Sequence, residues 1–275
     1  MTKRIKIKWK SIILIFIFLV LFIIFIISAV NILKWIIDSN NSKKQISSII
    51  ENTNITEIKD SKNTEYVIDE ENIDALDPYW DYIKYSLIDV DFNNLKEENQ
   101  DTVGWIQVKG TNINYPFVQT SDNDFYLKHS FNKKYNNAGW VFMDYRNKKD
   151  EYDKNTIIYA HGRYDNTMFG SLRKILSSDW TKNINNHVIT ISTEYENTLW
   201  QVFSVYKIKT TNDYLETNFT NEDSFLKFSK MLMDRSEYNF NTIVDKNDKI
   251  LTLSTCYDDD YKVVLHAKLI KREKK

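Results

Sequence analysis

Lys249-Ile-Leu-Thr-Leu-Ser-Thr-Cys256 has the pattern of a β-strand that ends on a thiol. Ile250 and other apolar residues alternate with polar ones, as expected for a strand with one buried face. The segment then continues into the acidic run Asp258-Asp259-Asp260. A cysteine at a strand end is partly exposed and can meet a substrate, whereas a structural cysteine is usually buried within the core. Cys256 is therefore a candidate nucleophile.

A free thiol is mostly protonated at neutral pH, so a nucleophilic cysteine needs an activating group, which is usually a histidine. His161 follows the apolar strand residues 157–160 and precedes Gly162, so it also lies at a strand end that faces a loop. This position favours His161 as the acid/base partner of Cys256. The remaining histidines have ordinary contexts, two expected on the surface and one within a strand: His129, His187 and His266.

Short strands dominate the chain after Gln100. Eight runs are rich in β-branched or aromatic residues and are separated by turn residues, which is typical of a closed or nearly closed β-barrel. The predicted strands are Val103–Val108, Ile113–Gln119, Gly139–Asp144, Thr156–His161, His187–Thr193, Leu199–Ile208, Lys249–Thr255 and Lys262–Ile270.

Helical patterns precede and interrupt these strands. Apolar residues at helical intervals predict an amphipathic helix over Tyr79–Leu87, and a short helix is expected around Phe92–Glu98. Further helices are predicted at Asn123–Lys128 and Met168–Leu176. A longer one, Glu222–Arg235, falls in the connection of about forty residues between the sixth and seventh strands, and connections of this length are usually functional.

The N-terminal region has the features of a membrane anchor. Ser11–Leu33 contains no charged residue and is apolar on all sides of a helix. It is long enough for a helix to cross a bilayer. A buried helix of a soluble protein would normally have a polar face, which this segment lacks. A cleaved signal peptide is the alternative, although Ser28-Ala29-Val30 is a poor cleavage site. The expected organisation is a cytoplasmic basic tail (1–10), a transmembrane signal anchor (11–33), a polar stalk (34–76) and an extracellular domain (77–275).

Charge and cysteine content narrow the class of protein. The first ten residues carry five bases and no acid, which places the N-terminus in the cytoplasm. The remaining chain has 32 basic against 38 acidic residues, and this mildly acidic body argues against nucleic-acid binding. A single cysteine in 275 residues cannot form an internal disulfide.

Two motifs together resemble the sortase family: Thr252-Leu-Ser-Thr-Cys256, and upstream Tyr159-Ala-His-Gly162. The resemblance covers about residues 80–270 and implies an eight-stranded sortase-type β-barrel. Four further segments are similar to class B of the family: Ile113–Gln119, Asp122–Leu127, Val141–Asp144 with Arg146-Asn147, and Asp165–Leu172. Class B also has N-terminal helices and a helix between the sixth and seventh strands.

The resemblance implies a cysteine transpeptidase. Cys256 would attack the carbonyl after Thr in a C-terminal sorting motif of the Asn-Pro-x-Thr type, and His161 would protonate the departing amine. Surface proteins that bear the motif would be donors, and an amine on a peptidoglycan precursor would be the acceptor. No cofactor or metal is expected. Residues expected to contact the substrate are Asn114, Ser254 and Thr255.

One position departs from the family pattern. The family places a catalytic Arg four residues before the His-Ala of the last strand, where this chain has Lys262. Lysine supplies charge without a planar fork of donors, so the exchange is not conservative. Lys262 is predicted to fill the role, with Arg163 as the alternative. A catalytically weak or inactive wall-binding module is the competing function, whereas a papain-type protease would place its Cys before its His.

Overall fold

The computed structural model describes residues 9–68, 78–258 and 260–275. The chain forms two units, one ending at Asn41 and the other comprising Ser42–Lys275. The expected basic tail lies almost entirely outside the described residues.

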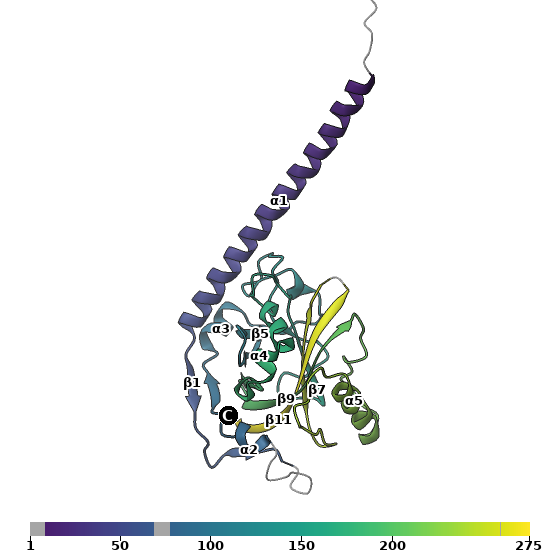
Figure 1. Cartoon of the computed structure of the whole chain (residues 1–275). Coiled ribbons are helices and arrows are strands. Elements are labelled where there is room, and N and C mark those ends of the chain that lie inside the picture. Colours follow the sequence, from purple (N-terminus) through teal and green to yellow (C-terminus); the bar gives the residue numbers. More distant parts are fainter. Residues whose placement is uncertain (1–8, 69–77, 259) are drawn as a thin grey trace, which may run out of the picture. The chain divides into compact units, whose positions relative to one another are not determined.

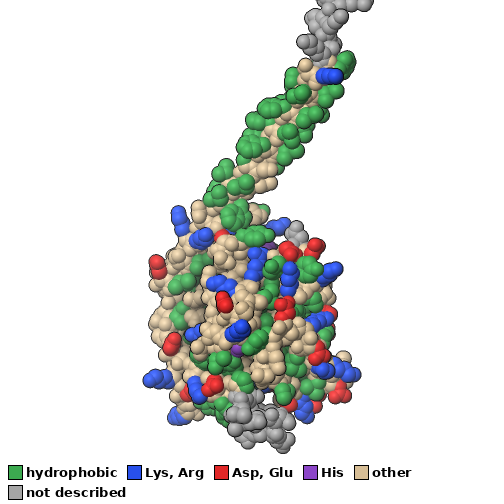
Figure 2. Space-filling view, in the orientation of Figure 1, with side chains coloured by type: hydrophobic (Ala, Val, Ile, Leu, Met, Phe, Trp, Pro, Cys, Tyr) green, Lys and Arg blue, Asp and Glu red, His purple; other side chains and the backbone are tan. Residues whose placement is uncertain are grey.

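The first described element is a single long helix, α1 (Trp9–Asn52), which contains the predicted span 11–33 and continues into the expected stalk. The large apolar side chains of its first part, residues 9–37, are exposed. Among the described residues, α1 is the helix long and apolar enough to cross a membrane. Figure 2 shows hydrophobic side chains covering the helix on the face in view. Because the backbone bonds of a helix are satisfied internally, such a segment is suited to lipid.

Eight strands of the second unit form a closed barrel, which confirms the predicted fold class (Figure 1). Their order around the barrel is β10-β7-β6-β5-β4-β8-β9-β11, and pairing of β10 with β11 closes it. The strands are β4 (Thr102–Val108), β5 (Asn114–Val118), β6 (Phe142–Met143), β7 (Asn155–Tyr159), β8 (Val188–Thr193), β9 (Glu196–Lys209), β10 (Ile250–Cys256) and β11 (Tyr261–Lys274).

The main core contains large side chains from most of these strands, and Trp105, Phe117 and Trp200 are at most 1% exposed. Burial of such side chains contributes about 1.5–3 kcal/mol each, which favours the barrel over other packings of the same strands. Tight burial here also keeps the strand ends that carry the candidate residues in fixed positions.

The predicted helix between the sixth and seventh barrel strands is confirmed as α5 (Glu222–Asp234). The Asn221 side chain accepts a hydrogen bond from the Ser224 amide and caps the helix. Phe225 and Leu232 are buried in a second apolar cluster together with barrel side chains such as Val264. Figure 1 shows α5 lying on the outside of the barrel.

Residues expected to be stalk pack with the barrel unit. β1 (Ile55–Ile58) pairs with β3 (Leu87–Val90), and β2 (Thr64–Tyr66) adds to β11. The short helix expected near Phe92–Glu98 is present as α3 (Asn93–Glu98). The folded unit therefore includes residues well before 77.

Other local predictions need correction. The helix expected over Tyr79–Leu87 is only one turn, α2 (Tyr79–Tyr82), because Leu87 and Ile88 are buried in strand β3 instead. His187, expected on the surface, is 3% exposed and bonds the Tyr82 hydroxyl at 2.8 Å. The remaining described helices are short: the 3-10 helices η1 (Phe125–Leu127), η2 (Gly170–Leu176) and η3 (Ile184–Asn186), and the single turn α4 (Ser178–Thr181).

Candidate active site

Cys256 and His161 leave the barrel at the same end. β7 and β10 are parallel neighbours, and their register pairs Tyr159 with Ser254, each two residues before a candidate residue. Parallel strands end at the same edge of a sheet, so the two side chains start from adjacent positions. Topology therefore brings together two residues that are far apart in the sequence.

The backbones at these two strand ends touch. The Thr255 hydroxyl donates to the Ala160 carbonyl at 2.8 Å. A Cβ atom added to Gly162 would lie only 1.9 Å from the Cys256 carbonyl oxygen. The chain directly after His161 therefore passes so close to Cys256 that only glycine fits there.

His161 is held from two sides. Its Nε2 atom lies 2.7 Å from the Leu127 carbonyl oxygen. Because a carbonyl only accepts, Nε2 carries a proton in this bond, which leaves Nδ1 as the nitrogen available for proton transfer. Gly139, with φ +62°, packs against the ring, and a Cβ there would lie 3.0 Å from His161 Cδ2 and 2.5 Å from the Tyr126 carbonyl oxygen.

Lys262 lies directly beside Cys256. The two residues pair across antiparallel strands β10 and β11, so their side chains point to the same face. Lys262 Nζ donates to Cys256 Sγ at 2.9 Å. Both side chains are part-buried, and an ammonium at this distance attracts negative charge that forms on the sulfur or on a nearby oxygen.

A cavity of about 420 Å³ opens in front of these three residues. Ser254 and Thr255, predicted to contact the substrate, also line it. The rest of its wall comes from the β5–β6 connection, from β6 and β7, and from the connection between β9 and α5: Asn123, Leu127, Phe142, Tyr159, Ala160, Thr210, Thr211, Asn212, Tyr214 and Leu215. The long connection identified in the sequence therefore contributes one side of the cavity.

Two other candidates lie elsewhere. Asn114 Oδ1 accepts hydrogen bonds from Trp105 at 2.6 Å and Gln107 at 3.1 Å, and Asn114 is not among the described lining residues. A substrate contact by Asn114 thus gains no support from the geometry. Arg163 forms an ion pair with Asp165 at 3.3 Å and is likewise absent from the described lining. Of the two candidate bases, Lys262 is the one at Cys256.

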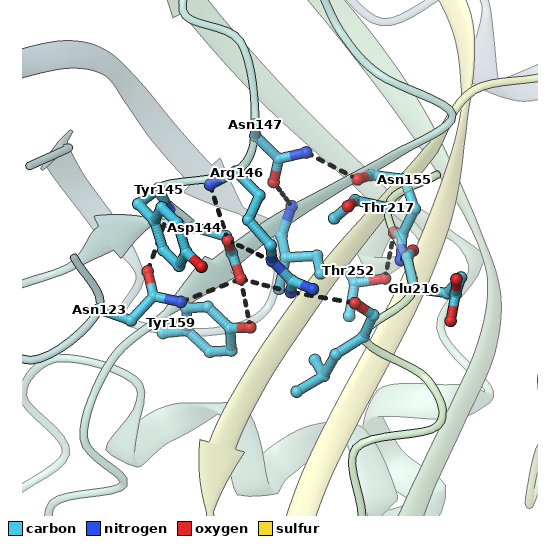
Figure 3. A network of polar contacts seen from close by, with 12 residues as sticks. Asn123, Asp144, Tyr145, Arg146, Asn147, Asn155, Tyr159, Glu216, Thr217 and Thr252 are labelled. Carbon is cyan, nitrogen blue, oxygen red and sulfur yellow. Dashed lines mark hydrogen bonds and ion pairs between the residues drawn. The ribbon is translucent and has the colours of Figure 1, made fainter. Parts of the chain in front are cut away.

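A buried polar network behind the cavity is built on Asp144 and Arg146, which belong to a segment noted in the sequence for its similarity to class B but given no role there (Figure 3). Asp144, fully buried, accepts from Arg146 at 2.8 and 2.9 Å, from the Tyr159 hydroxyl at 2.8 Å and from Asn123 at 3.1 Å. Arg146 also donates to the Leu215 carbonyl at 3.0 Å. One acidic group thereby ties together three cavity residues from three separate elements.

Asp144 is ionised in this setting. Burial alone would raise the pKa of its carboxyl, but hydrogen bonds from Arg146 and Tyr159 and the charge of Arg146 outweigh it and lower the pKa. Burial and the neighbouring carboxylate raise the pKa of Tyr159, so its phenol stays a donor. Besides the similarity of this segment to class B, the sequence signal for the network is an acid and a base two residues apart, directly after an apolar strand.

Within the described residues, no cluster of three or more His, Cys, Asp or Glu is arranged to hold a metal ion. What the geometry offers is a thiol, an imidazole and an ammonium around one groove at the end of a β-barrel. This arrangement defines a class of cysteine acyl-transfer enzymes, in which sulfur attacks a carbonyl and a histidine moves the proton.

Comparison with known proteins identifies the family. The Sortase domain family matches residues 106–270, so the chain belongs to the sortase family. Its relatives are of class B, and membership makes the chain a cysteine transpeptidase of a family associated with the cell surface.

Three relatives show the extent of the similarity. Sortase B of Listeria monocytogenes is 36% identical over 184 residues, covering 66% of this chain and 74% of that protein. A sortase B structure from Bacillus anthracis has 31% identity and a TM-score of 0.68, covering 86% of this chain and all but 1% of the other. A Staphylococcus aureus sortase B–substrate complex has 36% identity and a TM-score of 0.61, covering 66% and 84%.

Proposed function

We propose that this chain is a membrane-anchored transpeptidase that cleaves a C-terminal sorting motif of the Asn-Pro-x-Thr type and joins the released protein to a cell-wall amine. The observation that carries the proposal is the grouping of Cys256, His161 and Lys262 on one cavity, with Nζ 2.9 Å from Sγ. Each of the three residue types has a separate chemical task in acyl transfer.

Acylation uses all three. The Cys256 sulfur, as thiolate, attacks the carbonyl carbon after Thr, and a C–S bond forms while the carbonyl oxygen becomes negative. As the oxyanion collapses, the peptide C–N bond breaks and His161 delivers a proton from Nδ1 to the departing amine. The product is a thioester between Cys256 and the donor protein, with neutral imidazole ready for the second step.

Deacylation reverses the proton movement. An amine of a peptidoglycan precursor attacks the thioester, His161 takes its proton, and the Cys256 thiolate leaves. Water replaces the amine in a slower hydrolysis when no acceptor is present. The net reaction exchanges one amide bond for another, so no oxidant, metal or energy source is needed.

Lys262 stabilises the charge that develops on the carbonyl oxygen. An ammonium within reach of Sγ is also within reach of an oxygen bonded to the attacked carbon. Electrostatic stabilisation of this kind is commonly the largest single contribution to acyl transfer. A lysine holds the oxygen as a point charge, whereas an arginine would also fix the peptide backbone with several donors.

The groove has the character needed for an extended peptide. Apolar walls from Leu127, Phe142 and Leu215 accompany polar groups at Asn123 and Tyr214. The Tyr214 hydroxyl and Ser254 Oγ are 2.9 Å apart, which links the β9–α5 connection to the strand that carries Cys256. The related Staphylococcus aureus sortase B has been seen in complex with a substrate.

Anchoring follows from the first helix. The apolar part of α1, preceded by five bases in the first ten residues, supports a signal anchor with its N-terminus in the cytoplasm. Ser42–Lys275 would then lie outside the cell, where sorting signals and wall precursors meet. Tethering confines the enzyme to the membrane surface on which both substrates are presented.

Mass spectrometry of a sorting-motif peptide tests the proposal directly. The full chain in detergent micelles is incubated with the peptide and a set of candidate amines, with Cys256→Ala as the matched control. We expect a thioester on Cys256 and an amide product whose mass includes the amine. Absence of both with wild-type protein would favour the inactive wall-binding module, and equal cleavage by Cys256→Ala would exclude the thiol mechanism.

A further inference from the structure

One arginine bridges the two strand ends that carry the candidate catalytic pair. Arg173 lies on η2, the 3-10 helix that follows the His161 loop. Its Nη2 atom donates to the Gly162 carbonyl at 3.0 Å and also to the Tyr257 carbonyl. Gly162 directly follows His161, and Tyr257 directly follows Cys256. A single nitrogen of Arg173 therefore binds both strand ends.

The guanidinium is fixed in place by aromatic rings. The Arg173 Cζ atom lies 4.8 Å from the ring centre of Tyr164 and 5.2 Å from that of Tyr257. Arg173 Nε is buried and has no hydrogen-bond partner among the described residues. A buried donor without a partner is unfavourable, so the position of the guanidinium is set by its bonds to the two carbonyls and not by full hydrogen bonding of all its donors.

Arg173 is not among the described residues that line the cavity. Its contacts with the site run through the backbone carbonyls of Gly162 and Tyr257. Its two acceptors are the positions where a small shear between β7 and β10 would separate His161 from Cys256. The close contact of Gly162 with the Cys256 carbonyl oxygen prevents the two strand ends from moving closer together, but it does not prevent them from moving apart.

We infer that Arg173 is a positioning residue, which clamps the His161 and Cys256 strand ends together so that the imidazole is aligned for proton transfer. This inference rests on the proposed function. Misplacement of a catalytic group by about 1 Å can cost about 100-fold in rate. Loss of the clamp should therefore slow the step that needs the imidazole and leave peptide binding almost unchanged.

The test compares two substrates on the full chain in detergent. One is the sorting-motif peptide, whose amine leaving group needs a proton; the other is the matching peptide thioester, whose thiolate leaves without one. Arg173→Met should lower kcat for the peptide by about 10–100-fold with KM unchanged. With the thioester, acylation of Cys256 is measured in a single turnover before transfer, because transfer to the amine also uses His161. Arg173→Met should lower this acylation rate much less, as His161→Ala also should.

Two further variants separate alignment from folding. Arg173→Lys keeps a positive donor at shorter reach and should restore part of the peptide rate. Lys174→Met is the matched control, because Lys174 is exposed and its ammonium contacts only Asn112 at 3.4 Å among the described residues. If Arg173→Met does not fold, the smaller loss in Arg173→Lys must still fall mainly on the peptide.

The results distinguish this inference from the proposed function. Equal losses on both substrates, a rise in KM at constant kcat, or full activity of Arg173→Met would each overturn the clamp. None of these results would affect the thiol mechanism, which fails only if wild-type protein does not process the peptide or if Cys256→Ala does.

Discussion

Lys262 and Lys271 lie on the same strand, β11, and their ammonium groups have opposite surroundings. Lys271 is fully buried, and its Nζ donates to Asp60 at 2.7 Å and to the Ile83 and Tyr85 carbonyls at 2.7 and 2.6 Å. A lysine has three N–H donors, and here all three are used. Lys271 is a structural cation that ties the N-terminal segments to the barrel.

Lys262 has a different environment at the other end of the strand. Within the described part of the chain, the acceptor that the structure gives its Nζ is Cys256 Sγ, and the side chain borders the cavity. Two donors therefore remain for an oxygen that enters with a substrate. The difference teaches that the same residue on one strand stabilises the fold where its donors are saturated and can serve chemistry where they are not.

Removal of the nucleophile should give the largest effect at the catalytic end. Cys256→Ala should abolish both transpeptidation and hydrolysis, because the chain has no second thiol. His161→Ala should lower turnover by about 100-fold or more, the usual scale for an acid/base group. Both are measured as product formed from the sorting-motif peptide by mass spectrometry.

Thermal unfolding provides the control for these variants. Cys256 is only part-buried, so Cys256→Ala should unfold close to the wild-type temperature. Comparable peptide cleavage by Cys256→Ala would show that another residue is the nucleophile.

Lys262 should give the next largest effect. Lys262→Ala removes the ammonium beside Sγ and should slow acylation by about 100–1000-fold, or roughly 3–4 kcal/mol, as expected for loss of an oxyanion donor. Lys262→Arg should keep or improve the rate, because the guanidinium adds donors for the substrate backbone. Rapid-quench detection of the thioester measures acylation separately from transfer.

Arg163→Ala is the companion variant. Both members of the Arg163–Asp165 pair are at least nine-tenths buried, so this change should lower the unfolding temperature but have little effect on acylation. The opposite ranking would transfer the third catalytic role to Arg163. No effect of either change on the rate would leave the oxyanion to backbone amides.

The barrel end that carries the site was largely predictable from sequence. Each barrel strand is a run of β-branched or aromatic residues bounded by turn residues, so local pattern and final burial agree. Cys256 and His161 were identifiable because both follow apolar strands and precede loops. Their proximity depends on the parallel pairing of β7 with β10, which no local pattern shows.

The opposite end was predicted less well, for a physical reason. β2 is the polar, mostly exposed segment Thr64-Glu-Tyr66, which forms a strand because the edge of β11 offers backbone partners. Leu87 fits a helical repeat with Tyr79, yet it is buried in β3 beside β1. At the catalytic end, the Asp144 network likewise depends on partners that only the fold brings together. In each case tertiary contacts override local preference.

Lys271 should show the reverse phenotype to Lys262. Lys271→Met removes an ammonium that satisfies two buried carbonyls and Asp60, and should cost about 2–3 kcal/mol of unfolding free energy. This expected loss of stability is at the lower end for a buried ion pair because the Asp60 side chain is 36% exposed. Urea unfolding measures the loss, and kcat for the peptide should stay at the wild-type value.

Lys274→Met is the matched control for Lys271, since Lys274 lies on the same strand and is exposed. Its stability should differ from wild type by about 0.5 kcal/mol or less. If Lys271→Met were fully folded and still lost much of its peptide turnover, the two ends of β11 would be coupled.

His266 lies between the two lysines on β11 and should give the smallest effect, visible only as pH changes. It is fully buried between Thr252 Oγ1 at 2.9 Å and the Tyr206 hydroxyl at 2.8 Å. Burial, with a smaller contribution from the charge of Arg235, lowers the pKa of His266 to about 3.

Unfolding returns the His266 pKa to about 6.5, so between these values the unfolded chain binds a proton that the native chain does not. The stability contributed by neutral His266 is thus present above about pH 6.5 and is lost as the pH falls below it.

The loss of unfolding free energy should be about 1 kcal/mol between pH 7 and pH 5.5. In His266→Gln this part of the pH dependence should disappear, whereas His187, whose pKa burial also lowers, contributes equally to both proteins. Urea unfolding across this range measures the two slopes. If stability changed equally with pH in the two proteins, His266 would accept a proton in the native barrel. The middle of β11 would then be open to water, whereas only its Lys262 end is expected to be.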